Sequence, residues 1–292
     1  MSENDNELKH ATEINTQDKE IVYRRPLLAV ICFRIVIAFR VVLPKSLFLC
    51  FYRFAFASYK FIYRNVYLAR GIFSGKGEAM TFLIHDCMKY SLVGWEGMEA
   101  TYQVTRRIFS NKISGDLVEC GVAEGGSALL LCRLNEEYDE NRQVWLFDSF
   151  EGLPEPTDDD FKSGKTGFHV RPLPKGSCLG TIENVSNLLF DKYRIDRSNV
   201  ELVKGWFQDT LPNKASKIDQ IAVLRLDGDW YESTKCCLIH LYSKVVPGGV
   251  VILDDYISCF GCKKATDEFL QENGIDAKIE LDGRGGAWFL KP

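Results

Sequence analysis

The chain has 292 residues, of which 46% are hydrophobic and 26% are charged, and its net charge is −4. This composition is ordinary for a folded protein, and it excludes collagen-like, disulfide-scaffold and wholly disordered chains. The net negative charge also argues against nucleic acid as a partner.

The charges are unevenly distributed along the chain. Residues 1–20 carry two basic and six acidic side chains, whereas residues 21–77 carry ten basic side chains and no acidic one. The remaining residues carry 24 basic and 34 acidic side chains. Such blocks rarely belong to one domain. We therefore expect a disordered tail over 1–25, an apolar-basic helical segment over 26–76 and a main domain over 77–292.

The apolar-basic segment is typical of a region that contacts a membrane surface. Its first half, 26–43, is strongly apolar, and Pro44 would break or kink a helix there. A helix over 45–64 would carry a broad aromatic face beside a narrow basic stripe, which suits an interfacial helix on anionic lipid. The stripe consists of Lys45, Arg53, Lys60 and Arg64. We expect a cytoplasmic, membrane-associated protein that contacts the membrane through residues 26–64.

Two alternatives remain open for this segment. Residues 26–43 would be near the lower length limit for a single membrane-spanning helix. Arg34 and Arg40 lie within them, and each would cost about 2.5–3.5 kcal/mol in the middle of a bilayer. The other alternative is a helical hairpin that packs on the main domain or on another subunit.

The ten cysteines are scattered, and several lie inside apolar runs. Their distribution favours free thiols in a reducing compartment over a disulfide framework. Cys259 and Cys262 form one CxxC pair, but a zinc site would need two further ligands at suitable spacing. We therefore interpret this pair as structural or incidental.

From residue 77 onward, short apolar runs alternate with helical segments. A glycine-rich turn follows the first run and opens a helix over 128–134. The alternation predicts a Rossmann-like, doubly wound, mostly parallel seven-stranded sheet with an antiparallel edge strand. The expected strands are 117–122, 144–148, 200–203, 221–226 and 250–253, followed by a hairpin of 277–281 and 287–290.

Acidic residues and a glycine turn lie where ligands bind in such sheets, outside the carboxyl ends of the strands. Asp148 ends the second strand, where an acid accepts ribose hydroxyls in nucleotide-binding folds. The turn around Gly121 lacks both G-x-G-x-x-G spacing and a phosphate-loop lysine. Because Glu119 and Glu124 would repel a pyrophosphate, a cationic nucleoside such as S-adenosylmethionine suits this rim better.

A second acidic group comprises Asp227, Asp254 and Asp255, which follow the fourth and fifth strands. Carboxylates crowded at adjacent strand ends repel one another, and a hard divalent cation such as Mg²⁺ relieves that repulsion. Such a cation would hold neighbouring substrate hydroxyls and lower the pKa of one. A nearby carboxylate would then take the proton.

The polar stretch 155–180 between the second and third strands is interpreted as a mobile lid. Its acidic run, 158–160, is expected to be a solvated loop. His169 lies in the same stretch, and a lone histidine in a loop is more typical of a surface residue than of a substrate contact. Trp230 is expected either in the core or in the wall of the acceptor pocket.

Five sequence blocks resemble the macrocin O-methyltransferase family. They occur in the same order within residues 90–292. The family's members use S-adenosylmethionine and a metal to methylate sugar hydroxyls, often on natural products. The blocks are Gly-Asp-Leu-Val-Glu-Cys-Gly-Val (115–122), Asp-Ser-Phe-Glu-Gly-Leu-Pro (148–154), Gly-Trp-Phe-Gln-Asp-Thr-Leu-Pro (205–212), Leu-Arg-Leu-Asp-Gly-Asp-Trp-Tyr-Glu-Ser-Thr (224–234) and Pro-Gly-Gly-Val-Val-Ile-Leu-Asp-Asp-Tyr (247–256).

The resemblance implies roles for individual residues. Asp227, Asp254 and Asp255 match the metal ligands, and Asp227 also matches the general base. The cofactor residues that we expect are Glu119, Cys120, Gly121, Val122, Ala123, Ser127, Asp148, Ser149, Phe150, Gly205, Trp206 and Ser91.

The chain also departs from the family pattern. Ala123 and Glu124 stand where members usually carry Trp-Arg, and Ser91 replaces a threonine. No counterpart is apparent for the segment before residue 77. These departures concern the acceptor and the cellular setting more than the chemistry.

We therefore expect an S-adenosylmethionine- and divalent-metal-dependent O-methyltransferase that acts on a sugar or glycosylated acceptor, within a methyltransferase domain over 77–292. The membrane-facing segment suggests a lipid-linked or surface glycan, and the resemblance allows a homo-oligomer. The alternatives are an NAD-dependent sugar oxidoreductase and a non-catalytic, membrane-associated scaffold that binds the cofactor.

Overall fold

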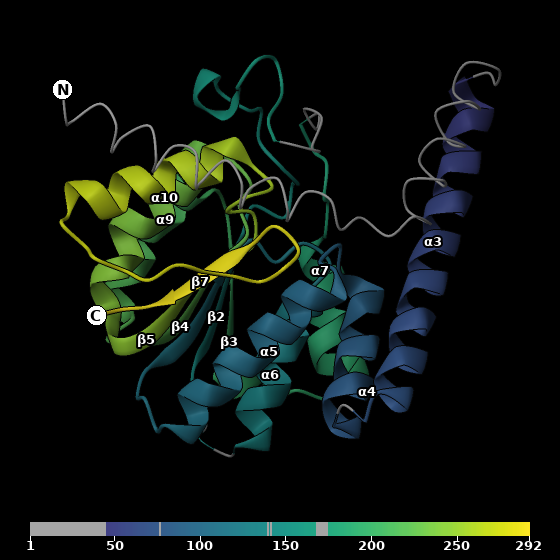
Figure 1. The fold of residues 1–292 in the computed structure, drawn as a ribbon, viewed down its shortest axis with the longest axis horizontal. Helices are drawn as coiled ribbons and strands as arrows, with labels where there is room; N and C mark the ends of the chain where they lie inside the picture. The colour runs from purple at the N-terminus through teal and green to yellow at the C-terminus, as the bar shows by residue number, and fades with distance from the viewer. Residues whose placement is uncertain (1–44, 76, 139, 141, 168–174) are drawn as a thin grey trace, which may run out of the picture. The chain divides into compact units, whose positions relative to one another are not determined.

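The computed structural model describes residues 45–75, 77–138, 140, 142–167 and 175–292. The expected tail over 1–25, the segment 26–43 and His169 lie outside the described residues. The chain divides into two compact units, Met1–Lys89 and Tyr90–Pro292. Figure 1 shows the described elements of both.

The first unit contains two helices, α3 (Lys45–Phe73) and α4 (Glu78–Cys87). Helix α3 begins directly after Pro44 and continues nine residues beyond the expected 45–64. The two helices approach closely at Gly71, where a Cβ atom would lie 2.4 Å from Cγ2 of the buried Thr81. In the described part of the chain, no helix combines the length and apolarity needed to cross a membrane.

The second unit is built on a seven-stranded sheet in the order β3-β2-β1-β4-β5-β7-β6. Figure 1 shows this sheet between the helices. The strands β1 to β5 run parallel, and β7 pairs antiparallel with both β5 and β6. The expected mostly parallel, Rossmann-like sheet is therefore confirmed. The strands are β1 (Asp116–Cys120), β2 (Val144–Asp148), β3 (Val200–Lys204), β4 (Ile221–Leu226), β5 (Val245–Leu253), β6 (Glu280–Leu281) and β7 (Ala287–Leu290).

Helices cover both faces of this sheet (Figure 1). On one face α5 contacts α6, β4 and β5, and on the other α9 contacts β4, α8 and α10. The helices are α5 (Trp95–Ser110), α6 (Gly126–Glu137), α7 (Ile182–Ser186), α8 (Phe207–Lys214), α9 (Tyr231–Leu241) and α10 (Phe260–Glu272). The short helical turns are η1 (Met88–Tyr90), η2 (Asp158–Asp160), η3 (Asn187–Lys192), η4 (Arg197–Asn199), η5 (Ala215–Lys217) and η6 (Tyr242–Lys244).

The core follows from the alternation of side chains along the strands. On β1 and β4, Val118, Cys120 and Leu224 belong to a buried apolar cluster that also includes residues of α9 and α10. Glu119 and Arg225 occupy the alternate positions, so they point to the opposite face of the sheet. Two charged side chains are thus buried within the sheet layer.

Strand β5 differs from the expectation. It begins at Val245 rather than at residue 250, so the residues 247–249 that were expected as a turn lie inside the strand. The pairing with β4 shifts register there, and Gly248 adopts a φ of 78° while its N–H bonds to Lys291 O. The glycines therefore form an irregularity within β5, and the strand continues through it.

Candidate active site

Asp148, at the end of β2, links three of the segments expected to hold a cofactor. Its Oδ2 accepts the N–H groups of Val122 and Ala123 at 2.7 and 3.0 Å, and its Oδ1 accepts that of Phe150 at 2.6 Å. Its backbone carbonyl accepts the N–H of Gly205 at 2.9 Å. The ends of β1, β2 and β3 therefore meet around one residue, Asp148.

The turn after β1 depends on glycine. Gly121 has a φ of 96°, and a Cβ atom there would lie 1.8 Å from the carbonyl oxygen of Asp227. The neighbouring Ala123 also has a positive φ, of 46°. The N–H of Asp227 in turn donates to Cys120 O at 2.8 Å. The turn expected to bind the cofactor is therefore in direct backbone contact with the start of the acidic group.

The other expected cofactor residues are held by contacts of their own. Ser149 is buried and donates to Gly152 O at 3.1 Å, and Trp206 caps the start of α8. Ser127 is buried in the first turn of α6. The Ser91 hydroxyl accepts the N–H of Val93, so this hydrogen bond is local and not part of the Asp148 rim.

The three expected metal ligands lie together. Asp227 follows β4, while Asp254 and Asp255 follow β5, which is the neighbouring parallel strand. Each side chain offers an oxygen atom, and the three oxygens lie within 4.8 Å of one another. We call these residues the acid cluster.

Two arginines that the sequence analysis did not single out hold this cluster. The fully buried Arg225 donates to Glu119 Oε1 at 3.0 Å, to Asp227 Oδ2 at 2.9 Å and to Asp254 Oδ1 at 2.6 Å. Arg284, on the loop between β6 and β7, donates to Asp254 Oδ2 at 2.9 Å. For Arg225 the sequence did contain a signal, because it is the single charged residue in an otherwise apolar strand. A buried arginine requires an acidic partner.

The acidic groups here outnumber the arginines. Burial raises the pKa of Glu119 to about 8 and that of Asp227 to about 6, and crowding by other carboxylates adds to both shifts. Burial also opposes the ionisation of Asp254, but Arg284 and Arg225 outweigh it and lower that pKa. A divalent cation would relieve the repulsion between these carboxylates when they ionise, and the all-oxygen donor set suits a hard ion. The residues therefore fit a Mg²⁺-type site.

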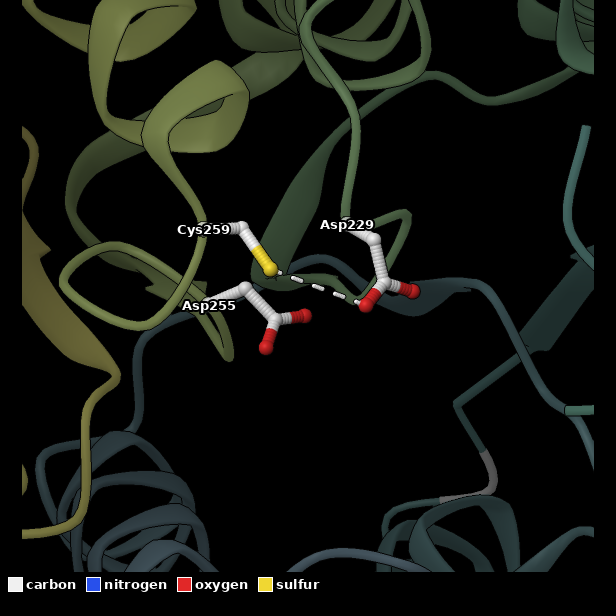
Figure 2. A group of neighbouring side chains, drawn as sticks. All are labelled: Asp229, Asp255 and Cys259. Carbon is white, nitrogen blue, oxygen red and sulfur yellow. Dashed lines mark hydrogen bonds between the residues drawn. The ribbon is translucent and has the colours of Figure 1, made fainter. Parts of the chain in front are cut away.

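A neighbouring group was missed by the sequence analysis (Figure 2). Asp229, Asp255 and Cys259 point toward one another, with donor atoms within 4.8 Å, and the Cys259 thiol donates to Asp229 Oδ1 at 3.7 Å. Burial raises the pKa of Asp229 to about 7 and holds that of the Cys259 thiol well above its usual range. The signal for Asp229 was the Asp-Gly-Asp spacing, which places a second acid beside Asp227.

One expectation for the lid was wrong. Asp160 is fully buried, not solvated, and its carboxylate accepts the N–H groups of Thr157 and Tyr231, each at 2.7 Å. The Thr157 hydroxyl and Asp160 form a capping box, a pattern readable in the sequence. Trp230 lies in the core, 1% exposed, and donates to Pro154 O at 3.1 Å. The first part of the lid is therefore fixed to the domain.

Comparison with known proteins gives a consistent result. A family model described as macrocin-O-methyltransferase (TylF) matches residues 84–291. Demethyldecarbamoylnovobiocin O-methyltransferase from Streptomyces niveus is 38% identical over 202 residues, covering 68% of this chain and 75% of that protein. The 8-demethyl-8-(2,3-dimethoxy-alpha-L-rhamnosyl)-tetracenomycin-C 4'-O-methyltransferase from Streptomyces olivaceus is 32% identical over 232 residues, covering 78% and 87% of the two chains.

Among solved structures, that of the O-methyltransferase NovP aligns with a TM-score of 0.61 and 36% identity. The alignment covers 69% of this chain and 82% of NovP. The family match begins at residue 84, after the end of α3. It therefore includes nearly all of the second unit and none of α3.

Proposed function

The chain belongs to the macrocin O-methyltransferase family, and from this premise we propose that it methylates a hydroxyl of a sugar or glycosylated acceptor with the help of a divalent cation. Membership makes the chain an O-methyltransferase and S-adenosylmethionine its methyl donor. It also speaks against the oxidoreductase and scaffold alternatives. The glycosyl acceptor is supported by the relative whose name specifies a rhamnosyl group.

The cofactor side of the proposal rests on Asp148. Three backbone N–H groups fix its carboxylate at the rim of β2. Carboxylate oxygens have further lone pairs, so Asp148 would accept the ribose hydroxyls of the cofactor while it holds the turn at Val122 and Ala123. That turn would border the methionine part of the cofactor, and Phe150 and Trp206 the adenine.

The metal side rests on a single observation, which carries the proposal of metal dependence. Asp227, Asp254 and Asp255 bring oxygen donors within 4.8 Å of one another at the ends of two adjacent strands, so their carboxylates repel one another when all three are ionised. These residues would hold Mg²⁺ or a similar ion. When bound, such a cation supplies Lewis acidity, which lowers the pKa of a substrate hydroxyl.

Asp227 would take the acceptor proton. Arg225 donates to only one of its carboxylate oxygens, Oδ2, and so orients the group without engaging the other oxygen. As the proton moves to Asp227, the acceptor oxygen forms a bond to the methyl carbon and the carbon–sulfur bond of the cofactor breaks. The products are a methyl ether and S-adenosylhomocysteine, so the atoms and charges balance.

Transfer of labelled methyl groups from S-adenosylmethionine to a panel of glycosides tests this function, with and without Mg²⁺. We expect turnover that requires Mg²⁺ and falls at least 100-fold in Asp227→Asn, in keeping with the loss of general base catalysis. Asp276→Asn, at an exposed position, is the matched control. Turnover that persists fully in the presence of a chelator would overturn the metal dependence but not the methyl transfer.

We also propose that α3 lies on an anionic membrane surface and brings the enzyme to a lipid-linked or surface glycan. The helix has 29 residues and no acidic side chain. Leu47, Phe54 and Phe61 are spaced by seven residues, so they share one face, and each is more than half exposed. Apolar side chains on a basic helix are typical of interfacial binding. A cytoplasmic location, domain boundaries near 25 and 76 and a homo-oligomer belong to the same proposal.

A further inference from the structure

We propose that Arg284 acts as a stand-in cation at Asp254 and competes with the divalent ion for that carboxylate. This inference rests on the metal site proposed above and adds a device that sets its affinity. Arg284 would be a positioning residue, because it acts through Asp254 and not on the reacting atoms.

The contacts of Asp254 lead to this inference. Its Oδ1 accepts from Arg225 at 2.6 Å and its Oδ2 accepts from Arg284 at 2.9 Å. The Asp254 side chain is only 5% exposed, so solvent has little access to it. Both oxygens already accept from positively charged guanidinium groups, so a divalent cation that bound Asp254 would lie beside them and be repelled.

Arg225 is not the group that gives way. It is fully buried inside β4, and the same guanidinium also bonds to Glu119 and Asp227. Its departure would leave several buried carboxylates without a counter-charge, which is strongly unfavourable. Arg284 has 28% of its side chain exposed, and its ion pair is to Asp254.

The backbone around Arg284 is fixed by hydrogen bonds, whereas the side chain is partly exposed. Asp282 Oδ1 accepts the N–H groups of Arg284, Gly285 and Gly286 at 2.7, 2.9 and 3.0 Å. The carbonyl of Gly285 accepts the N–H groups of Ile257 and Ser258 at 2.7 and 3.0 Å. The loop is thereby tied to the segment that follows Asp254 and Asp255. Release of Asp254 therefore needs only rotation of the Arg284 side chain.

The exchange has a clear electrostatic effect. Without a divalent ion, Arg284 partly neutralises the acid cluster and stabilises the ionised form of Asp254. When the ion is present, it neutralises the acid cluster in place of the Arg284 guanidinium and repels that group, which moves toward solvent. Each binding event must therefore break the ion pair between Arg284 and Asp254, and the measured affinity for the cation is lower than the acids alone would give.

Titration of the full-length protein with Mn²⁺, followed by the paramagnetic signal of the free ion, tests this competition. We expect Arg284→Gln to bind Mn²⁺ about tenfold more tightly than the unaltered protein, and Arg284→Lys to bind nearly as the unaltered protein does. Arg197→Gln removes the same charge from an exposed site and should leave the affinity unchanged. In an Asp254→Asn background, Arg284→Gln should no longer increase the affinity.

Equal or weaker binding by Arg284→Gln would overturn the competition while leaving the metal site intact. Absence of Mn²⁺ binding in every variant would instead overturn the proposed metal site, and this inference with it. A thermal unfolding curve for each variant shows whether it folds. If Arg284→Gln does not fold, Arg284→Met offers the same test without the charge.

Discussion

Arg225 lies opposite Glu119 in the parallel ladder of β4 and β1, and its guanidinium group donates a hydrogen bond to Glu119 Oε1 at 3.0 Å between two fully buried side chains. Among the described residues, Glu119 Oε2 and Arg225 Nε have no hydrogen-bond partner. The remaining donors of Arg225 bond to Asp227 and Asp254. Glu119 thus helps to position Arg225, which in turn bonds to Asp227 and Asp254 of the acid cluster.

The Glu119–Arg225 pair predicts a difference between two substitutions. Glu119→Ala leaves a buried N–H group of Arg225 without its acceptor and should lower the free energy of unfolding by about 1–3 kcal/mol. Glu119→Gln should cost much less, because burial raises the pKa of Glu119 to about 8 and the group already holds a proton near neutral pH. Urea denaturation measures both, with the exposed Glu272→Ala as the control.

The same pair predicts a pH dependence. Because the pKa in the folded state is higher than the ordinary value, the contribution of Glu119 to stability is fully present below that ordinary value. It is lost as the pH rises through about 8. Unfolding midpoints measured from pH 5 to pH 9 should therefore fall less in Glu119→Gln than in the unaltered protein. Parallel curves would contradict a raised pKa at this position.

Asp148 predicts the affinity for the cofactor. Replacing Asp148 with Asn removes a charged acceptor of three backbone N–H groups and should weaken binding of S-adenosylmethionine about tenfold or more, which is about 1.4 kcal/mol. Asp148→Ala should weaken it further. Calorimetric titration measures the affinity, and Asp276→Asn serves as the control. An unchanged affinity in both variants would place the ribose elsewhere.

We expect position 121 to require glycine for lack of space as well as for its backbone conformation, and the two causes can be separated. Gly121→Ala places a Cβ atom 1.8 Å from a backbone oxygen, in addition to the cost of the positive φ. Gly164 also has a positive φ, of 72°, but open space around it, so Gly164→Ala carries the strain alone. We expect Gly121→Ala to lower the melting temperature by several degrees more than Gly164→Ala. Equal shifts would show that the turn can move away from β4.

Helix α3 predicts binding to lipid vesicles. The full-length protein should float with anionic vesicles, bind neutral ones weakly, and lose affinity as salt is raised. The double change Phe54→Ser and Phe61→Ser should weaken this binding about tenfold, because two exposed aromatic side chains are lost. Phe161→Ser removes a partly exposed phenylalanine of the second unit and serves as the control. Equal binding by all three proteins would refute the membrane proposal.

Much of the fold could be predicted because its signals are local. The apolar runs that became β2 and β4 matched the structure residue for residue, and the acids that follow the strands lie where parallel topology places them. Strand β5 was predicted too short because Pro-Gly-Gly usually marks a turn. Here the neighbouring Lys291 pairs with the glycines, and such long-range pairing is not visible in a local pattern.

The parts of the site that were missed depend on contacts between distant segments. Arg284 lies 30 residues from Asp254, and nothing in its own glycine-rich loop indicates that partner. Asp160 was read as solvated because two other acids precede it, yet it is fully buried against the first residue of α9. Charge runs describe composition, whereas burial depends on how the chain folds over them.

The acids at the end of β4 and β5 have a further consequence through their two arginines. Because guanidinium groups already counter much of their charge, the fold would not need the metal ion in order to form. Under the proposed chemistry, treatment with a chelator would leave the enzyme dormant and intact, and adding the ion back would restore it at once. The supply of metal in the cell would then control how many of the molecules work, and not how many survive.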